Sequence, residues 1–192
     1  QHYEKKFMDD DPDLVVTSVN APEEVQSGSG EYVEWTVLNQ GDDTAPGGWT
    51  EYVYLSDDKV IGDDIKISEF TYEYNLNVGI DYTHTHPVTF PEDLGGNYWV
   101  VVKTNGGGDV NEYEWDENNA MISADSVNVT PKPYPDLVVS GVSVPDTVNS
   151  NDEIEVSWTV TNVGDAATNV PGWYDRVYLS TTTSTVGAKE LG

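Results

Sequence analysis

The sequence contains no cysteine, and this absence excludes three kinds of chemistry at once. Without thiols there is no disulfide framework, no zinc site of the thiolate type and no cysteine nucleophile. The absence does not assign the chain to the cytosol, because an exported β-protein can also lack cysteine. Its compartment has to be inferred from other features.

Basic residues are almost as scarce. The chain has 8 Lys and Arg residues against 35 Asp and Glu, which gives a formal net charge of −27. Nucleic acids and anionic membrane surfaces attract proteins through clustered basic residues, so we expect no nucleic-acid partner. No stretch is long and apolar enough to span a bilayer, and we expect no direct membrane insertion. The acidic excess is typical either of a surface suited to salty water or of one that collects divalent cations.

Catalytic motifs are absent as well. The sequence has no G-x-S-x-G elbow, no H-E-x-x-H, no phosphate-binding glycine loop before a helix and no EF-hand consensus. Among 35 carboxylates some pair will lie at a glycosidase distance by chance, so acid pairs carry no information here. The sequence therefore predicts a protein that is not an enzyme.

What the chain does contain is an internal repeat with a period of about 123 residues, the size of one domain. Three motifs recur in the same order: PDLVV (12–16 and 135–139), V-x-W-T-V-x-N-x-G-D (33–42 and 156–165), and GW followed by VYLS (48–56 and 172–180). We expect an N-terminal extension (1–11), a complete first copy (12–131), a proline-rich linker (132–135) and the first half of a second copy (136–192).

Alternating apolar residues predict strands. Val33, Trp35 and Val37 share one face, and the second copy again has valine, tryptophan and valine there, which marks this face as core. About seven short strands separated by turn residues favour an all-β fold, an antiparallel β-sandwich, with almost no helix. The expected strands are residues 14–19, 31–39, 51–56, 65–70, 82–90, 97–103 and 122–129.

The repeated motifs resemble the cell-adhesion-related domain found in bacteria, known as CARDB. The order PDLVV, V-x-W-T-V-x-N-x-G, W-x-x-x-V-Y-L-S resembles the first part of that domain, and the segments 96–102, 109–112 and 117–119 resemble its end. The resemblance covers one full copy and half of another. It implies an immunoglobulin-like β-sandwich on a secreted or cell-surface protein, with an adhesive role and no catalytic residues.

Two acidic clusters are candidates for calcium, which binds six to eight oxygens. The first cluster lies in one expected loop, and the second copy has residues 181–184 (TTTS) in its place, so we do not expect a site there throughout the repeats. Calcium is the one cofactor that we predict. The candidate ligands are Asp57, Asp58, Asp63 and Asp64 in the first cluster, and Asp109, Asn111, Glu112, Asp116 and Glu117 in the second.

Three smaller features are also candidate sites. His84 and His86 lie on one side of an expected strand, as a transition-metal pair or as surface histidines. Tyr113 and Trp115 stand in an acidic loop, where exposed rings could stack on sugars, whereas the other tryptophans are expected to pack in the core or at its edge. Asn128 begins an N-glycosylation sequon.

The leading functional prediction is a structural or adhesive repeat module of an extended, extracellular or cell-surface protein. The module would form filaments and be stabilised by calcium. Its expected partners are neighbouring copies of the repeat, other surface proteins, and glycans. The alternative is a carbohydrate-binding accessory module of a secreted hydrolase. We expect the second copy to be completed either by a continuation of the chain or by strands from another chain.

Overall fold

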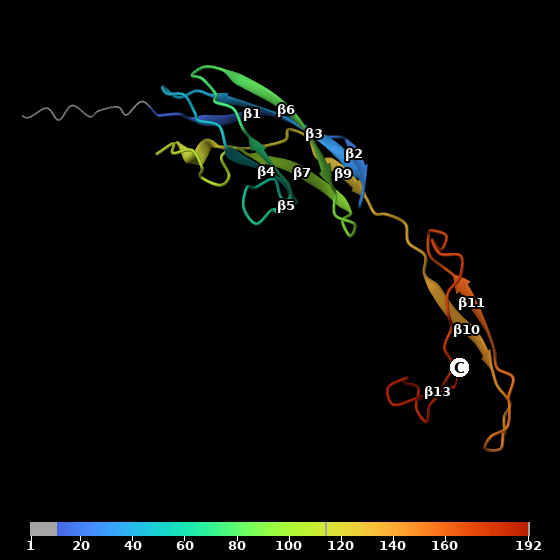
Figure 1. The fold of residues 1–192 in the computed structure, drawn as a ribbon. Coiled ribbons are helices and arrows are strands. Elements are labelled where there is room, and N and C mark those ends of the chain that lie inside the picture. The colour runs from blue at the N-terminus through green and yellow to red at the C-terminus, as the bar shows by residue number, and fades with distance from the viewer. Residues whose placement is uncertain (1–10, 114, 192) are drawn as a thin grey trace, which may run out of the picture. The chain divides into compact units, whose positions relative to one another are not determined.

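The computed structural model describes residues 11–113 and 115–191 (Figure 1). They divide into two compact units, of which the first ends at Lys132 and the second begins at Pro133. Strands are the main regular structure of both units. The described residues include no helix long and apolar enough to cross a membrane.

The first unit has nine strands and one 3₁₀ turn among its described residues. In chain order they are β1 (Leu14–Asn20), β2 (Glu24–Gln26), β3 (Gly30–Asn39), β4 (Trp49–Ser56), β5 (Ile65–Tyr72), β6 (Asp81–Thr89), β7 (Gly96–Lys103), η1 (Asp116–Asn118), β8 (Ala120–Ile122) and β9 (Val127–Thr130).

These strands form two sheets that face each other. One sheet has the order β1-β3-β6, and the other has the order β2-β9-β7-β4-β5, with β8 also paired to β7. Every pairing is antiparallel except that of β2 with β9. Figure 1 shows the two layers of the first unit. The prediction of an immunoglobulin-like β-sandwich is confirmed.

The core lies between the two sheets, and the predicted face of β3 points into it. Val33, Trp35 and Val37 are fully buried, as are Trp49 and Val53 of β4 in the opposite sheet. β3 forms ladders with both β1 and β6, which makes it the central strand of its sheet. Burial of large apolar side chains from both sheets is the main stabilising contribution.

The expected single strand over residues 122–129 is wrong, because the chain turns within it. The hydroxyl of Ser123 accepts a hydrogen bond from the backbone N–H of Val100 at 3.0 Å and donates to the carbonyl of Asp125 at 2.8 Å. These bonds end β8 at Ile122 and allow β9 to begin at Val127. The short strand β2 was not expected, because three residues are too few to show alternation.

The second unit contains two separate ladders. β10 (Leu137–Ser143) pairs with β11 (Ser157–Asn162), and β12 (Tyr178–Leu179) pairs with β13 (Lys189–Glu190). The register of the first ladder, Leu137 opposite Asn162, repeats that of Leu14 opposite Asn39 in the first unit. The local structure of the second unit therefore follows the sequence repeat.

Candidate functional site

A carboxylate lies at the centre of the apolar core of the first unit. Glu51 of β4 is fully buried and shares the inward face of its strand with Trp49 and Val53. Its carboxylate accepts hydrogen bonds from four side chains: the indoles of Trp35 and Trp49, and the hydroxyls of Tyr82 and Thr104. Three of the donors come from the two sheets and the fourth, Thr104, from the turn after β7, so this carboxylate links the sheets through the core.

The surroundings of Glu51 oppose its ionisation. Burial raises the pKa of Glu51, and its four hydrogen bonds only partly offset that effect. Burial and the neighbouring Glu51 charge also raise the pKa of Tyr82, so this phenol remains a donor. No Lys or Arg contributes to either pKa shift. The arrangement suits a structural polar centre.

A second buried carboxylate joins three segments near one end of the sandwich. Glu112 is 2% exposed and accepts from the backbone N–H of Leu14 at 2.5 Å, at the start of β1. It also accepts from the side-chain amides of Asn105 and Asn119, each at 2.5 Å. Burial raises the pKa of Glu112, the three hydrogen bonds lower it, and the nearby charge of Asp13 raises it again.

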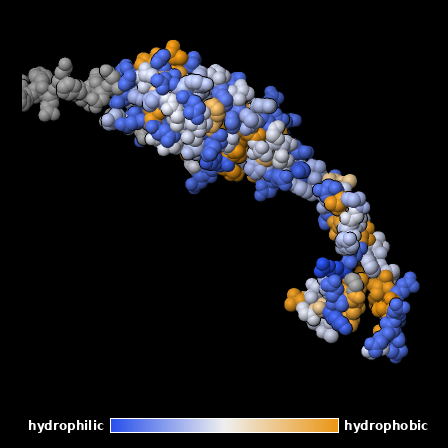
Figure 2. Space-filling model, viewed as in Figure 1, coloured by the Kyte–Doolittle hydropathy of each residue, from blue (hydrophilic) through white to orange (hydrophobic). Residues whose placement is uncertain are grey.

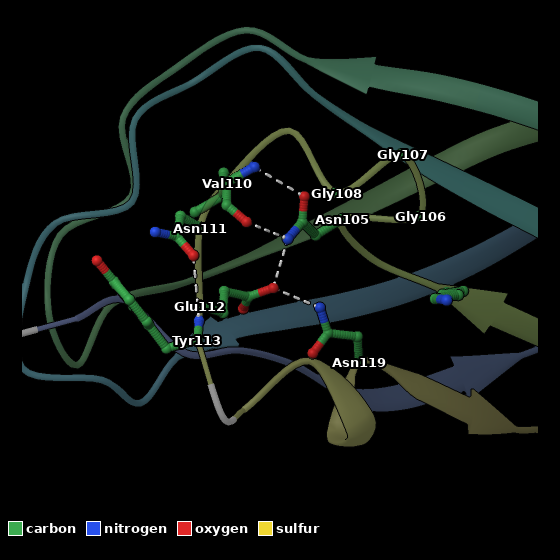
Figure 3. A pocket seen from close by; sticks show the side chains of 10 residues that line it. Asn105, Gly106, Gly107, Gly108, Val110, Asn111, Glu112, Tyr113 and Asn119 are labelled. Atoms are coloured by element: carbon green, nitrogen blue, oxygen red, sulfur yellow. Dashed lines mark hydrogen bonds between the residues drawn. The ribbon is translucent and has the colours of Figure 1, made fainter.

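Glu112 borders a pocket of about 530 Å³ (Figure 3). The pocket is lined by the turn after β7 and by the residues that follow this turn. In the turn, the side chain of Asn105 donates to the carbonyl of Val110 and accepts from its backbone N–H. Figure 3 shows the Asn105 and Asn119 amides directed at the Glu112 carboxylate. Three donors already bind both oxygens of Glu112. This carboxylate therefore connects the turn, β1 and the segment before β8.

The structure places the first predicted calcium cluster in the loop between β4 and β5. Asp57, Asp58 and Asp63 are exposed. One oxygen of Asp58 accepts from the backbone N–H of Val60 at 2.9 Å, and one oxygen of Asp64 accepts from that of Gly62 at 3.0 Å. These bonds shape the loop.

The second predicted cluster is spread over a longer stretch. Asp109 accepts from the backbone N–H of Thr50 at 3.1 Å, Asn111 accepts from that of Tyr113 at 3.4 Å, and Glu117 is exposed. The side chain of Asp116 lies outside the described residues. Within the described part of the chain, no three His, Asp or Glu side chains converge as a metal-binding group. Calcium at either cluster stays a prediction.

The predicted sugar-binding rings and the glycosylation residue are accessible. Tyr113 is 62% exposed and lines the pocket, and Trp115 is 53% exposed. Asn128 lies on the exposed face of β9, between β2 and β7. Exposure is necessary for both roles, and both stay predictions.

The edge where β5 and β6 meet is closed by side chains. β5 pairs with β4, β6 pairs with β3, and no ladder joins β5 to β6 among the described strands. Instead, the rings of Tyr72 and Tyr82 stack with centroids 3.9 Å apart. Farther along, Phe70 stacks on His84 at 3.7 Å, and Ser68 lies 3.1 Å from His86. We call these three pairs the β5–β6 seam.

The sequence analysis did not identify Glu51, although a signal was present. In the second unit the indole of Trp158 donates to Asp175 at 2.9 Å, which matches the bond from Trp35 to Glu51. Each acid follows the second tryptophan of its copy by two residues. An acid repeated at this position of both copies is the pattern that could have found Glu51.

A polar turn is also repeated. The side-chain oxygen of Asn39 accepts from the backbone N–H groups of Asp13 and Gly41. The oxygen of Asn162 accepts in the same way from residues 136 and 164. In both turns a Cβ on the glycine would collide with the backbone of the preceding segment, at residues 11–13 and 134–136. This explains the N-x-G motif.

Comparison with known proteins gives one family and several solved structures. The family model of CARDB matches residues 11–123, more than half of the chain. No curated protein matches. The crystal structure of a CARDB domain from Pyrococcus furiosus, in complex with di-metal ions, is 20% identical, and the match covers 64% of this chain and 97% of that one with a TM-score of 0.47.

Two other solved structures are similar. The solution structure of the same Pyrococcus furiosus domain is also 20% identical, covers 64% of this chain and 99% of that one, and has a TM-score of 0.46. A β-glucosidase from Listeria innocua in complex with isofagomine is 18% identical over 62% of this chain but 16% of its own, with a TM-score of 0.41. The family match together with the two-sheet fold establishes that the chain belongs to the CARDB family of cell-adhesion-related, non-catalytic domains.

Proposed function

We propose that the chain is a structural and adhesive repeat module of a secreted or cell-surface protein. In this proposal the second unit docks strands that have the pattern of β6, β7 and β9. One observation carries the proposal: residues that are buried in the first unit are exposed at the repeated positions of the second. The pairs are Trp35 (0%) and Trp158 (36%), Trp49 (0%) and Trp173 (48%), and Leu55 (1%) and Leu179 (63%).

The strands that cover this face in the first unit indicate what would cover it in the second. Val88 of β6, Val100 and Val102 of β7 and Val127 of β9 pack in the core of the first unit. The described strands of the second unit, β10 to β13, include no counterpart of β6, β7 or β9. Figure 2 has hydrophobic residues at the surface of this unit. An apolar face beside open strand edges is a surface that recruits strands.

Strands of the same repeat fit this face best, because the core of the first unit is made from them. They would come from further repeat sequence, in the same molecule or in a neighbouring one. A copy that completes its neighbour forms a head-to-tail contact, which can continue into a filament. This gives the module its adhesive and structural role, and no step of it involves catalysis.

Light scattering on the 192-residue chain tests the proposal. The expected result is association that increases with protein concentration and is lost on Trp158→Asp combined with Leu179→Asp. The matched control is Val186→Asp, because Val186 is exposed in the same unit but belongs to none of the repeated motifs. A chain that remains monomeric with a cooperatively folded second unit would refute the proposal.

Calcium is the proposed stabilising cofactor of the first unit. Asp57, Asp58 and Asp63 stand exposed in one short loop, where their negative charges repel each other. A divalent cation would relieve that repulsion. The net charge of −27 also favours the binding of cations.

Glycan binding is the second candidate function. Tyr113 and Trp115 are both more than half exposed, and Tyr113 lines the pocket next to Glu112. Aromatic rings beside polar groups are suited to sugar rings, which stack on one face and hydrogen-bond at their edges. Titration with a panel of oligosaccharides tests this role. Specific binding that Trp115→Ala abolishes would favour it over the repeat-module function.

A further inference from the structure

The two histidines of the β5–β6 seam lie closer together than the sequence alone could establish. Nε2 of His84 and Nδ1 of His86 are 3.4 Å apart. The two residues alternate along β6, so both rings project from the same face of the strand. Both side chains are partly exposed, which leaves one side of the pair open to solvent.

That separation matches the geometry of a shared metal ion. Zinc binds imidazole nitrogen at about 2.0–2.1 Å in tetrahedral geometry, which places two nitrogen ligands about 3.4 Å apart. An ion between His84 and His86 would therefore require little change in the distance between these two nitrogens. In the ion-free state the two nitrogens share one proton, since a neutral imidazole has one donor and one acceptor nitrogen.

Neighbouring side chains already fix both rings. Phe70 stacks on His84 with an interplanar angle of 17°. The rings of Trp35 and His84 meet edge to face, with their centroids 5.2 Å apart. The hydroxyl of Ser68 lies 3.1 Å from Nε2 of His86. When Nε2 donates to that hydroxyl, Nδ1 of His86 presents its lone pair to the ion. An oxygen partner on the second nitrogen is the usual support of a metal-bound histidine.

The two imidazoles also select the class of ion. A metal binds a histidine ring in its neutral form. Imidazole nitrogen favours zinc, copper and nickel over calcium and magnesium.

We propose that His84 and His86 form a two-imidazole site for a transition-metal ion of the zinc(II) or copper(II) type. Water completes the coordination on the open side of the seam. On binding, the ion replaces the shared proton between the two rings, and His84 carries its own proton on Nδ1. The site is separate from the acidic loops and takes a different class of cation.

Isothermal titration of the 192-residue chain with zinc chloride tests the site, at about pH 7.5 in roughly 0.15 M salt with excess magnesium to occupy carboxylates. We expect one zinc ion per chain. His84→Gln and His86→Gln should each weaken binding at least tenfold. Thermal melting of each variant establishes that the first unit remains folded.

Two matched controls separate this site from other ligands. His2 is the remaining histidine of the sequence, and His2→Gln should leave zinc affinity unchanged. Asp58→Asn in the acidic loop should also leave it unchanged. The proposal is overturned if folded His84→Gln or His86→Gln keeps zinc affinity within twofold, or if His2→Gln or Asp58→Asn removes binding. As a second readout, zinc should shift the ring-proton resonances of both seam histidines, and unshifted rings would refute the site.

Discussion

Trp158 donates its indole N–H to Asp175 at 2.9 Å, in a unit where both side chains are exposed. The first unit makes the same kind of bond, from Trp35 to Glu51, in its core. The segments that carry each pair therefore lie alike in the two units, although Asp175 precedes β12 whereas Glu51 is part of β4. This part of the repeat therefore keeps the same local contact in both units.

Replacing Trp35 by alanine should remove a large part of the stability of the first unit. The side chain is fully buried and contacts Phe70, so its loss leaves a cavity in the core. We expect a decrease of about 3–5 kcal/mol in the free energy of unfolding, measured by urea denaturation. Trp115→Ala is the matched control, because Trp115 is half exposed, and it should change stability by less than about 0.5 kcal/mol. Similar effects of the two substitutions would mean that the assigned core is wrong.

Glu51 should make the first unit less stable as the pH rises. Burial raises the pKa of Glu51 above the ordinary value of a glutamate, so the folded state holds this proton more tightly than the unfolded state does. The resulting stabilisation is fully present below the unfolded pKa and is lost as the pH rises through the folded pKa. The Glu51→Gln variant has no titrating group at this position, and all its other charges are the same as in the wild type.

The difference in unfolding free energy, wild type minus Glu51→Gln, should therefore decrease with pH above about 4.5 and then level off. The steepest possible decrease is about 1.4 kcal/mol per pH unit for one proton. Urea denaturation of both proteins from about pH 4 to pH 8 measures it. A constant difference, or one that grows with pH, would contradict the raised pKa.

Glu112→Ala should destabilise the first unit although the substitution removes a charge from a very acidic chain. It leaves three donors, the backbone N–H of Leu14 and the amides of Asn105 and Asn119, without their acceptor. Buried donors without a partner cost about 1–3 kcal/mol each, so a loss of at least about 2 kcal/mol is expected in thermal or urea unfolding. Glu117→Ala removes the same charge from an exposed position and should be nearly neutral. If both variants behave alike, Glu112 does not join the three segments.

Calcium binding should appear as a rise in melting temperature. At free calcium about one hundred times the dissociation constant, binding stabilises the folded state by about 2.7 kcal/mol. Chelator should then lower the melting temperature, and Asp58→Asn combined with Asp63→Asn should abolish the effect. Asp125→Asn, which changes an exposed acid outside the loop, is the control. A melting curve that excess chelator leaves unchanged would remove calcium from the proposed function.

The sequence predicted the strands whose side chains alternate and left out those defined by other contacts. Trp35 and its neighbours on β3 were found because alternation repeats in both copies. β2 was missed because its three residues depend on a parallel pairing with β9, far along the chain. The stacking of Tyr72 on Tyr82 was not predictable either, since it depends on how two sheets close at an edge.

The candidate sites also differ in how far they could be predicted from the sequence. The acidic clusters were visible because their members are neighbours in sequence, whereas Glu112 receives one of its hydrogen bonds from Leu14, 98 residues away. Composition marked the chain as acidic but gave no indication that three of its carboxylates, those of Asp13, Glu51 and Glu112, are buried. Such residues become identifiable only when the fold brings their donors together.

Hydrogen exchange of the second unit, followed as a function of protein concentration, tests the docking of strands most directly. The amides of β11 and β12 should exchange quickly in dilute 192-residue chain and become protected as the concentration rises, because the exposed faces of second units from different copies then cover one another. Trp158→Asp combined with Leu179→Asp should abolish this protection, and Val186→Asp should not. Protection in β11 and β12 that is already high in dilute solution, or that never appears at any concentration, would contradict the account.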